Sequence, residues 1–169
     1  TMQNTDSDGL IGLSLDYKDY AGNSGTTATA TSDGSQVTFD RTVPTITTAT
    51  LASNNTYSNR KAKVGDIVTL TIVASENIID APTVTMGTLA GMTGVTPTGS
   101  GTSWSATYAI QDGDTEENLR FTFAFSDLAA NAGSTINATT DANPVAIDKT
   151  ATNLGTFAVD LNSGSDSGV

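Results

Sequence analysis

The sequence repeats itself at a spacing of 108 residues, and this feature constrains the fold more than any other. Residues 19–42 align with residues 127–150 without a gap, and close to half of the aligned positions are identical. Asp19 aligns with Asp127, at the start of both segments. A fixed internal period is the signature of a repeat architecture, in which each unit is one structural module. We therefore predict that the chain is a section of a tandem array.

Apolar and polar residues alternate along much of the chain. Ile11, Leu13, Leu15 and Tyr17 occupy every second position, and the residues 108 positions later are also apolar. A period of two is typical of strands that bury one face. Between residues 43 and 150 the pattern predicts seven strands, at 45–52, 67–74, 83–87, 92–96, 103–110, 119–126 and 134–148. The last of these is expected to be interrupted near residues 141–144, because Pro144 cannot donate to a ladder. We therefore predict an all-β fold, an immunoglobulin-like sandwich of about seven strands.

The repeat also predicts how the chain divides into units. The boundary falls at residues 40–44, where Pro44 stiffens the start of a strand. We predict that residues 43–150 form a complete repeat. Residues 1–42 would supply the last three strands of a preceding repeat, and residues 151–169 the first strand of a following one. Neither partial unit has enough strands to bury a sandwich core alone, so pairing with a neighbouring chain is one way to order these ends.

Composition and charge exclude several functional classes. The 169 residues include neither cysteine nor histidine, which removes thiol nucleophiles, imidazole bases and the zinc sites that depend on them. No convergent catalytic group can be drawn, so we do not expect an enzyme. The net charge is −11, from 18 acidic and 7 basic residues, and it disfavours nucleic acid and anionic membranes. No apolar run reaches membrane-spanning length, so direct membrane insertion is not expected.

Carboxylates gather at the predicted junction between two units. Successive strands of a sandwich run in opposite directions, so strands 67–74 and 119–126 end where the chain enters the unit. Glu76 and Asp127 follow these strands, and Asp40 lies in the incoming linker. Calcium binds about six to eight oxygen ligands, among them carboxylates. The sequence thus predicts a calcium clamp of these three acids, and the alternative is three solvated loop acids.

Three further candidates for metal binding follow from the repeat and from the turn. Asn131 lies four residues after Asp127, in the same turn. Asp19 is the counterpart of Asp127 in the preceding unit, and Asp148 would take the part of Asp40 at the next junction.

A second acidic cluster, in the loop at residues 112–117, contains two more candidates. Asp112 and Asp114 have the spacing with which a calcium loop begins. The glycine and the glutamates of this loop are not at the positions of an EF-hand, so a solvated turn is the favoured interpretation.

Side chains suited to other kinds of binding are few. Trp104 lies on the apolar positions of its strand and is expected in the core. Tyr57, in a long loop, is a better candidate for surface contact, but it stands alone. Arg60, Lys61 and Lys63 form a small basic patch, which would face either the acidic end of a neighbouring unit or solvent.

Several short segments occur in an order and spacing that are characteristic of one class of repeat. These segments are residues 51–55, 62–66, 74–76, 101–108, 113–116, 127–133 and 148–151. On them the chain resembles bacterial Ig-like repeats, which form long arrays in very large surface and secreted proteins, many of them adhesins. Two positions depart from the pattern: Ala130 stands where Gly22 keeps the usual glycine, and Thr152 stands where Pro44 keeps the usual proline.

The repeat, the junction acids and the resemblance together imply a structural role. We expect an extender or spacer of a large bacterial extracellular or cell-surface protein, with neighbouring repeats as partners and calcium (Ca2+) stiffening the junctions. Two alternatives stay open. One is an adhesion module that binds a host or matrix glycan or protein, and the other is a fibre subunit that self-associates by strand exchange of its incomplete ends.

Overall fold

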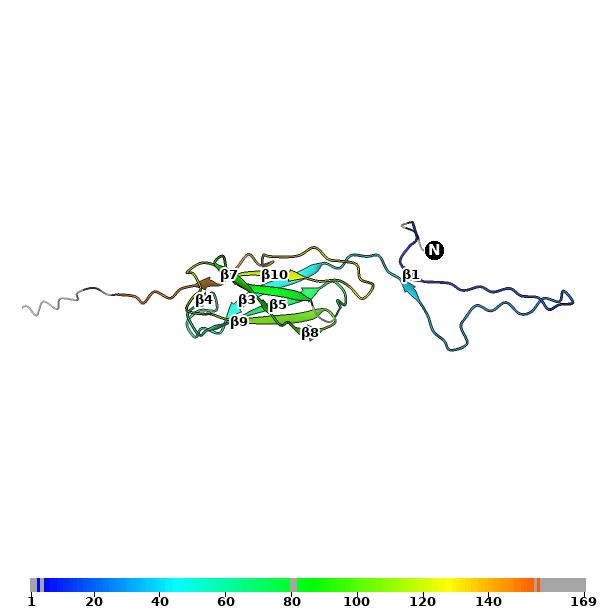
Figure 1. Cartoon of the computed structure of the whole chain (residues 1–169), viewed down its shortest axis with the longest axis horizontal. Helices are drawn as coiled ribbons and strands as arrows, with labels where there is room; N and C mark the ends of the chain where they lie inside the picture. Colours follow the sequence, from blue (N-terminus) through cyan, green and yellow to red (C-terminus); the bar gives the residue numbers. More distant parts are fainter. Residues whose placement is uncertain (1–2, 4, 80–81, 154, 156–169) are drawn as a thin grey trace, which may run out of the picture.

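The structure, a computed structural model, describes residues 3, 5–79, 82–153 and 155. Over these residues the protein has eleven strands and no helix, which confirms the all-β class. The described chain accordingly has no helix that is long and apolar enough to cross a membrane. A two-layered body carries most strands, and the N-terminal segment with β1 (Gly9–Leu10) and β2 (Thr38–Phe39) projects from one end of it (Figure 1).

The first layer of the body is a four-stranded antiparallel sheet. In spatial order it contains β3 (Ile46–Ser53), β5 (Ile67–Ala74), β9 (Ser103–Ala109) and β8 (Thr98–Ser100). Leu70 of β5 lies opposite Leu51 of β3 on one side and Ala106 of β9 on the other. All three are buried, because side chains on alternate positions of a strand share one face. The predictions for 45–52, 67–74 and 103–110 are therefore confirmed within one residue.

The second layer is a three-stranded antiparallel sheet. Its spatial order is β10 (Arg120–Ala124), β6 (Thr83–Thr88) and β7 (Gly91–Val95). Phe121 lies opposite Met86 and Phe123 opposite Val84, and all four are buried. A separate parallel pair joins β4 (Lys61–Ala62) to β11 (Ala146–Ile147).

One hydrophobic core lies between the two layers. It gathers buried residues of β3, β5 and β9 with those of β6 and β10. Trp104 belongs to it, as predicted, with 5% of its surface exposed and its indole Nε1 donating to the carbonyl of Gly101 at 3.0 Å. Full burial of one large apolar side chain contributes about 1.5–3 kcal/mol, so this core is the main source of stability.

The edges of the sheets differ from the predicted strands. The strand expected at 92–96 is present as β7, which forms a two-residue hairpin with β6. The edge strand next to β9 is β8, which lies in a stretch that the alternation did not predict as a strand. Gly99 of β8 has φ +145°, and a Cβ there would lie 2.2 Å from the carbonyl oxygen of Ser103. The close approach of β8 to β9 thus depends on a glycine, which apolar alternation cannot reveal.

The strand predicted at 134–148, with a break near residues 141–144, is confirmed only in part: the break is present, but residues 134–140 form no continuous strand. Only β11 and isolated bridges, such as Phe123 with Ile136, have strand pairing there. The reason is a competition for hydrogen bonds between this segment and β3. The backbone N–H of Thr140 donates to the carbonyl of Ala49, and its hydroxyl accepts from the N–H of Ala49, so a side chain interrupts the ladder. Pro144 offers no N–H to continue it.

The N-terminal segment reproduces the contacts found 108 residues later. Leu15 bridges to Ala28 as Phe123 bridges to Ile136. Gly25 packs so closely on the ring of Tyr17 that an added Cβ would lie 2.2 Å from it, and an equivalent glycine–phenylalanine contact recurs 108 residues later. The strand predicted within residues 151–169 lies almost wholly outside the described residues.

Candidate metal centre

Three acids reach the junction from three separate segments. Glu76 lies two residues after the end of β5, in a turn next to the start of β3. The backbone N–H of Ser75 fixes this turn by donating to the carbonyl of Thr45 at 2.8 Å. Asp127 follows β10 and bridges to Ile78. Asp40 follows β2, in the linker that enters the body.

The three carboxylates lie close together. One oxygen from each of Asp40, Glu76 and Asp127 lies within 4.8 Å of the others. Asp127 is buried, with 1% of its surface exposed, and the other two are half-buried. Within the described residues this is the one group of three or more such side chains with metal-binding spacing. The structure therefore brings the three predicted acids together.

Asp127 is held by the turn that follows it. Its Oδ1 accepts hydrogen bonds from the backbone N–H groups of Ala129 and Asn131, both at 2.8 Å. Its Oδ2 accepts from the side-chain Nδ2 of Asn131 at 2.8 Å. A carboxylate offers about four acceptor positions, so these three bonds leave capacity for a cation.

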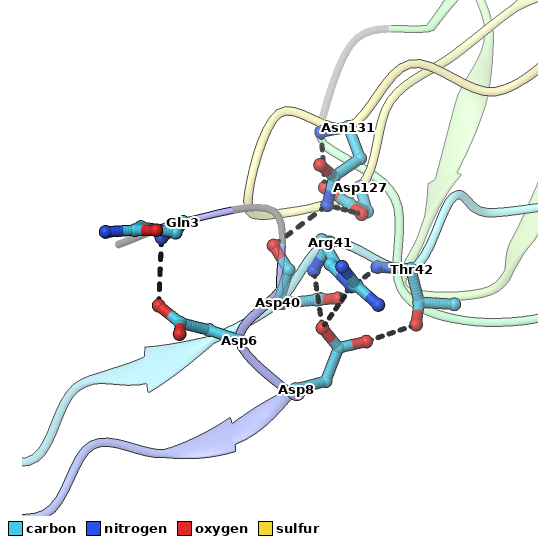
Figure 2. A network of polar contacts seen from close by, with 8 residues as sticks. All are labelled: Gln3, Asp6, Asp8, Asp40, Arg41, Thr42, Asp127 and Asn131. Atoms are coloured by element: carbon cyan, nitrogen blue, oxygen red, sulfur yellow. Dashed lines mark hydrogen bonds and ion pairs between the residues drawn. The ribbon is translucent and has the colours of Figure 1, made fainter. Parts of the chain in front are cut away.

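Asn131 connects the turn to the linker. Its Nδ2 donates both to Asp127 and to the backbone carbonyl of Asp40, the latter at 3.2 Å (Figure 2). In this arrangement Asn131 faces the acids with a donor nitrogen. Its amide nitrogen therefore holds the linker to the turn, and its role as a metal ligand stays a prediction.

Electrostatic repulsion is built into the cluster. Burial raises the pKa of the Glu76 carboxyl above its usual value, and the charges of Asp40, Asp127 and Asp8 raise it further. Each of these effects disfavours the ionised form of Glu76. A bound cation would reverse the sign of the local field, so the cluster has the electrostatics of a cation site.

Asp8 is a member of this junction that the sequence reasoning did not select. It accepts a hydrogen bond from the backbone N–H of Arg41 at 3.0 Å and another from the hydroxyl of Thr42, and its carboxylate lies 3.9 Å from Arg41 Nε (Figure 2). The bond from Thr42 is the main cause that lowers the pKa of Asp8. The repeat places Asp8 at the same position as Glu116. Glu116 accepts the corresponding two bonds, from the backbone N–H of Lys149 and the hydroxyl of Thr150.

Asp19 and Asp148 lie apart from the cluster. Asp19 is exposed and forms the same turn as Asp127: it accepts from Asn23 N–H and Asn23 Nδ2, both at 2.8 Å. Asp148 lies beside the parallel strand pair, and its Oδ2 is 3.7 Å from Lys61 Nζ. Neither belongs to a group of three acids among the described residues.

The loop at 112–117 has a structural explanation. Asp114 is buried and accepts from the hydroxyl of Tyr108 at 2.9 Å and from the N–H of Gln111 at 2.7 Å. Burial, followed by this hydrogen bond, raises the pKa of Tyr108 to about 12. The carbonyl of Asp112 accepts from Lys149 Nζ at 2.8 Å. The carboxylate of Asp114 and the backbone carbonyl of Asp112 thus hold a turn in place, but the prediction that this turn is solvated is wrong for Asp114, which is buried.

One member of the basic patch, Arg60, makes its contacts within the body. Its guanidinium donates to the carbonyls of Leu51 and Asn143 at 2.7 and 3.0 Å and pairs with Asp141 at 3.1 Å. These contacts fasten the segment before β11 onto the first sheet. For Arg60, the expectation of a neighbouring unit or solvent is therefore wrong.

No known protein family and no curated protein matches the chain. The assignment of a function therefore rests on the geometry described above.

Proposed function

We propose that the chain is a section of a tandem array of Ig-like units that acts as an extracellular spacer, stiffened by calcium where the linker enters the unit. The observation that carries this proposal is the convergence of Asp40, Glu76 and Asp127. One acid comes from the linker and two come from the body, so a single ion would join the two.

The sheet order supports the Ig-like part of the proposal. An immunoglobulin-like sandwich has one sheet of its first, second, fifth and fourth strands. The order β3-β5-β9-β8 fits this pattern if β7 is an added strand next to β6, as in the variable-type arrangement.

Calcium would act on the linker through its charge. In its absence the junction depends on the bond from Asn131 to the Asp40 carbonyl and on the Asp8 contacts, while the acids repel one another. A bound ion would turn this repulsion into attraction and restrict the angle between linker and body. Hard, oxygen-rich sites of this kind select calcium or magnesium over softer metals.

The arrangement of aromatic rings favours a spacer over a module that stacks sugars on paired rings. Such a module would present exposed aromatic rings side by side. Among the described residues, the one pair of rings in contact is Phe123 with Phe125, and both are buried. Tyr57 is fully exposed but makes no ring contact there.

A calcium titration of the whole chain tests the proposal. We expect the melting temperature to rise, because a ligand at about 100 times its Kd stabilises the state that binds it by about 2.7 kcal/mol. Small-angle scattering should show a narrower range of maximum dimensions, and a chelator should reverse both changes. Glu76→Gln should abolish the response, whereas the control Asp112→Asn, in the other acidic loop, should keep it. A wild-type chain that shows neither change would defeat the calcium clamp.

A further inference from the structure

The projecting hairpin, residues 5–42, has an apolar face that nothing in the described structure covers. Leu15 is 57% exposed, Tyr17 55% and Val37 61%. Their equivalents 108 residues later are among the most buried side chains: Phe123 is 1% exposed and Val145 0%. Contiguous exposed apolar surface of this kind usually marks an interaction site.

The structure itself shows what kind of surface fits this face. Phe123 and Val145 are buried in the core that they share with the alternating apolar residues of β5 and β9. Because the hairpin has the same backbone bridges, its apolar side chains point to the same side as their buried equivalents. A sheet with the apolar chemistry of β3, β5 and β9 would therefore be complementary to it.

A polar group at the rim of the face specifies the partner further. The Oδ2 of Asp6 accepts from the N–H of Gln3 at 2.9 Å, as Asp114 accepts from Gln111 (Figure 2). The other oxygen of Asp114 accepts from Tyr108, a residue of β9. The equivalent oxygen of Asp6 is thus oriented for a hydroxyl donor on the covering sheet.

A second acid of the hairpin, Asp33, completes the pattern. Asp33 accepts from the N–H of Ser35 at 2.9 Å, and its equivalent Asp141 accepts from Asn143 N–H at 3.1 Å. Asp141 also pairs with Arg60, in the loop that follows β3. A sheet that covers the hairpin in the same way would place a guanidinium beside Asp33, which gives charge complementarity between the two surfaces.

We propose that the apolar face of the hairpin docks an antiparallel β-sheet that carries a tyrosine for Asp6 and an arginine for Asp33. This occupant is a sheet of the same kind as β3-β5-β9, and the proposal rests on the tandem-array function proposed above. The register is defined by the repeat: Thr1 aligns with Ala109, so a segment with the sequence of residues 43–108 joined to Thr1 continues the pattern without a gap.

An extended chain tests the docking. A second copy of residues 43–108 is placed ahead of Thr1 in the full chain, and amide exchange of residues 9–39 is followed by mass spectrometry. We expect exchange to slow by about 100-fold or more, because covered strands open only in cooperative unfolding events. The matched control is the same extension with serine at the positions of Val68, Leu70 and Ile72, which removes the apolar face and should give no protection.

The polar contacts are tested by a double-mutant cycle in the extended chain. Asp6→Ala and, in the added segment, Tyr108→Phe should each reduce protection, and the two effects should not add, because each removes the same hydrogen bond. Additive effects would overturn the Asp6 contact. Fast exchange of the hairpin in the extended chain would overturn the docking surface.

The unextended chain distinguishes a rival occupant. If its hairpin becomes protected as protein concentration rises, together with dimers in sedimentation, a second copy covers the face and the proposal is wrong. Calcium titration of the same unextended chain reports on the Asp40 cluster separately, so failure of the docking and failure of the spacer proposal can be told apart.

Discussion

The hairpin at residues 5–42 and the segment at residues 113–150 make the same local contacts in different surroundings. Both have an aspartate turn closed by an asparagine and a glycine packed on an aromatic ring. In both, an acid near the start of the segment accepts a hydrogen bond from the threonine at its end. The segment at 113–150 is covered by a sheet, whereas the hairpin is exposed. The comparison shows that short-range sequence determines these turns, whereas the contribution of the apolar side chains depends on a partner sheet.

The largest difference should appear at matched core positions. Phe123→Ala should lower the free energy of unfolding by about 3–5 kcal/mol, because it leaves a cavity in the core. Leu15→Ala, at the equivalent position, should change it by less than about 0.5 kcal/mol, since its side chain is largely exposed. Urea denaturation of both variants measures the difference. Similar losses would mean that the hairpin is covered in solution.

The aspartate turns should differ by a smaller amount. Asp127→Ala removes a buried carboxylate and leaves the N–H groups of Ala129 and Asn131 without their acceptor, at a cost of about 1–3 kcal/mol. Asp19→Ala removes the same bonds from an exposed turn, where water replaces them, so the cost should stay below about 1 kcal/mol. Thermal unfolding without calcium compares the two, and equal costs would contradict the role assigned to burial.

The third comparison concerns turn conformation. Ala130 has φ 69° and Ala142 has φ 55°, while their equivalents Gly22 and Gly34 have φ 91° and 72°. The left-handed conformation costs a non-glycine residue about 1–2 kcal/mol. Ala130→Gly should therefore stabilise the body, by up to about 1 kcal/mol after the entropy of the unfolded chain is included. No gain in the urea midpoint would show that another contact determines this turn.

The smallest effect should be the pH dependence of Glu76. The pKa of Glu76 is higher in the folded protein than in the unfolded chain. The contribution of Glu76 to the free energy of unfolding is therefore fully present below the unfolded pKa of about 4.3 and is lost as pH rises through the folded pKa. At pH 7 without calcium, Glu76→Gln should be slightly more stable than wild type, and the difference should vanish in acid. Urea midpoints across this range measure it. A variant that is less stable at pH 7 would contradict repulsion as the main effect.

Much of the fold could be predicted from the sequence, because buried strands display their burial in apolar alternation. The failures lie where other forces decide. Thr140 bonds to Ala49 across 91 residues, and β8 depends on a glycine close to β9, neither of which alternation encodes. At the junction, strand direction was enough to predict that Glu76 and Asp127 converge with Asp40. Asp8 was missed because its hydrogen bonds come from a backbone N–H and a hydroxyl group, which no charge pattern reveals, and its charged neighbour Arg41 lies at 3.9 Å.

The parallel pairing of β4 with β11 has a mechanical consequence. The chain leaves the body just after β11, where the N–H groups of Ala146 and Asp148 donate to the carbonyls of Arg60 and Ala62 at 2.9 and 2.8 Å. These bonds lie across the strand direction, so tension along the exit strand loads them in shear. They must rupture together instead of one after another, and the ion pair of Lys61 with Asp148 lies at the same place. A chain pulled from its exit would therefore first load the bonds of Lys149 and Thr150 to Glu116 and then meet this short pair.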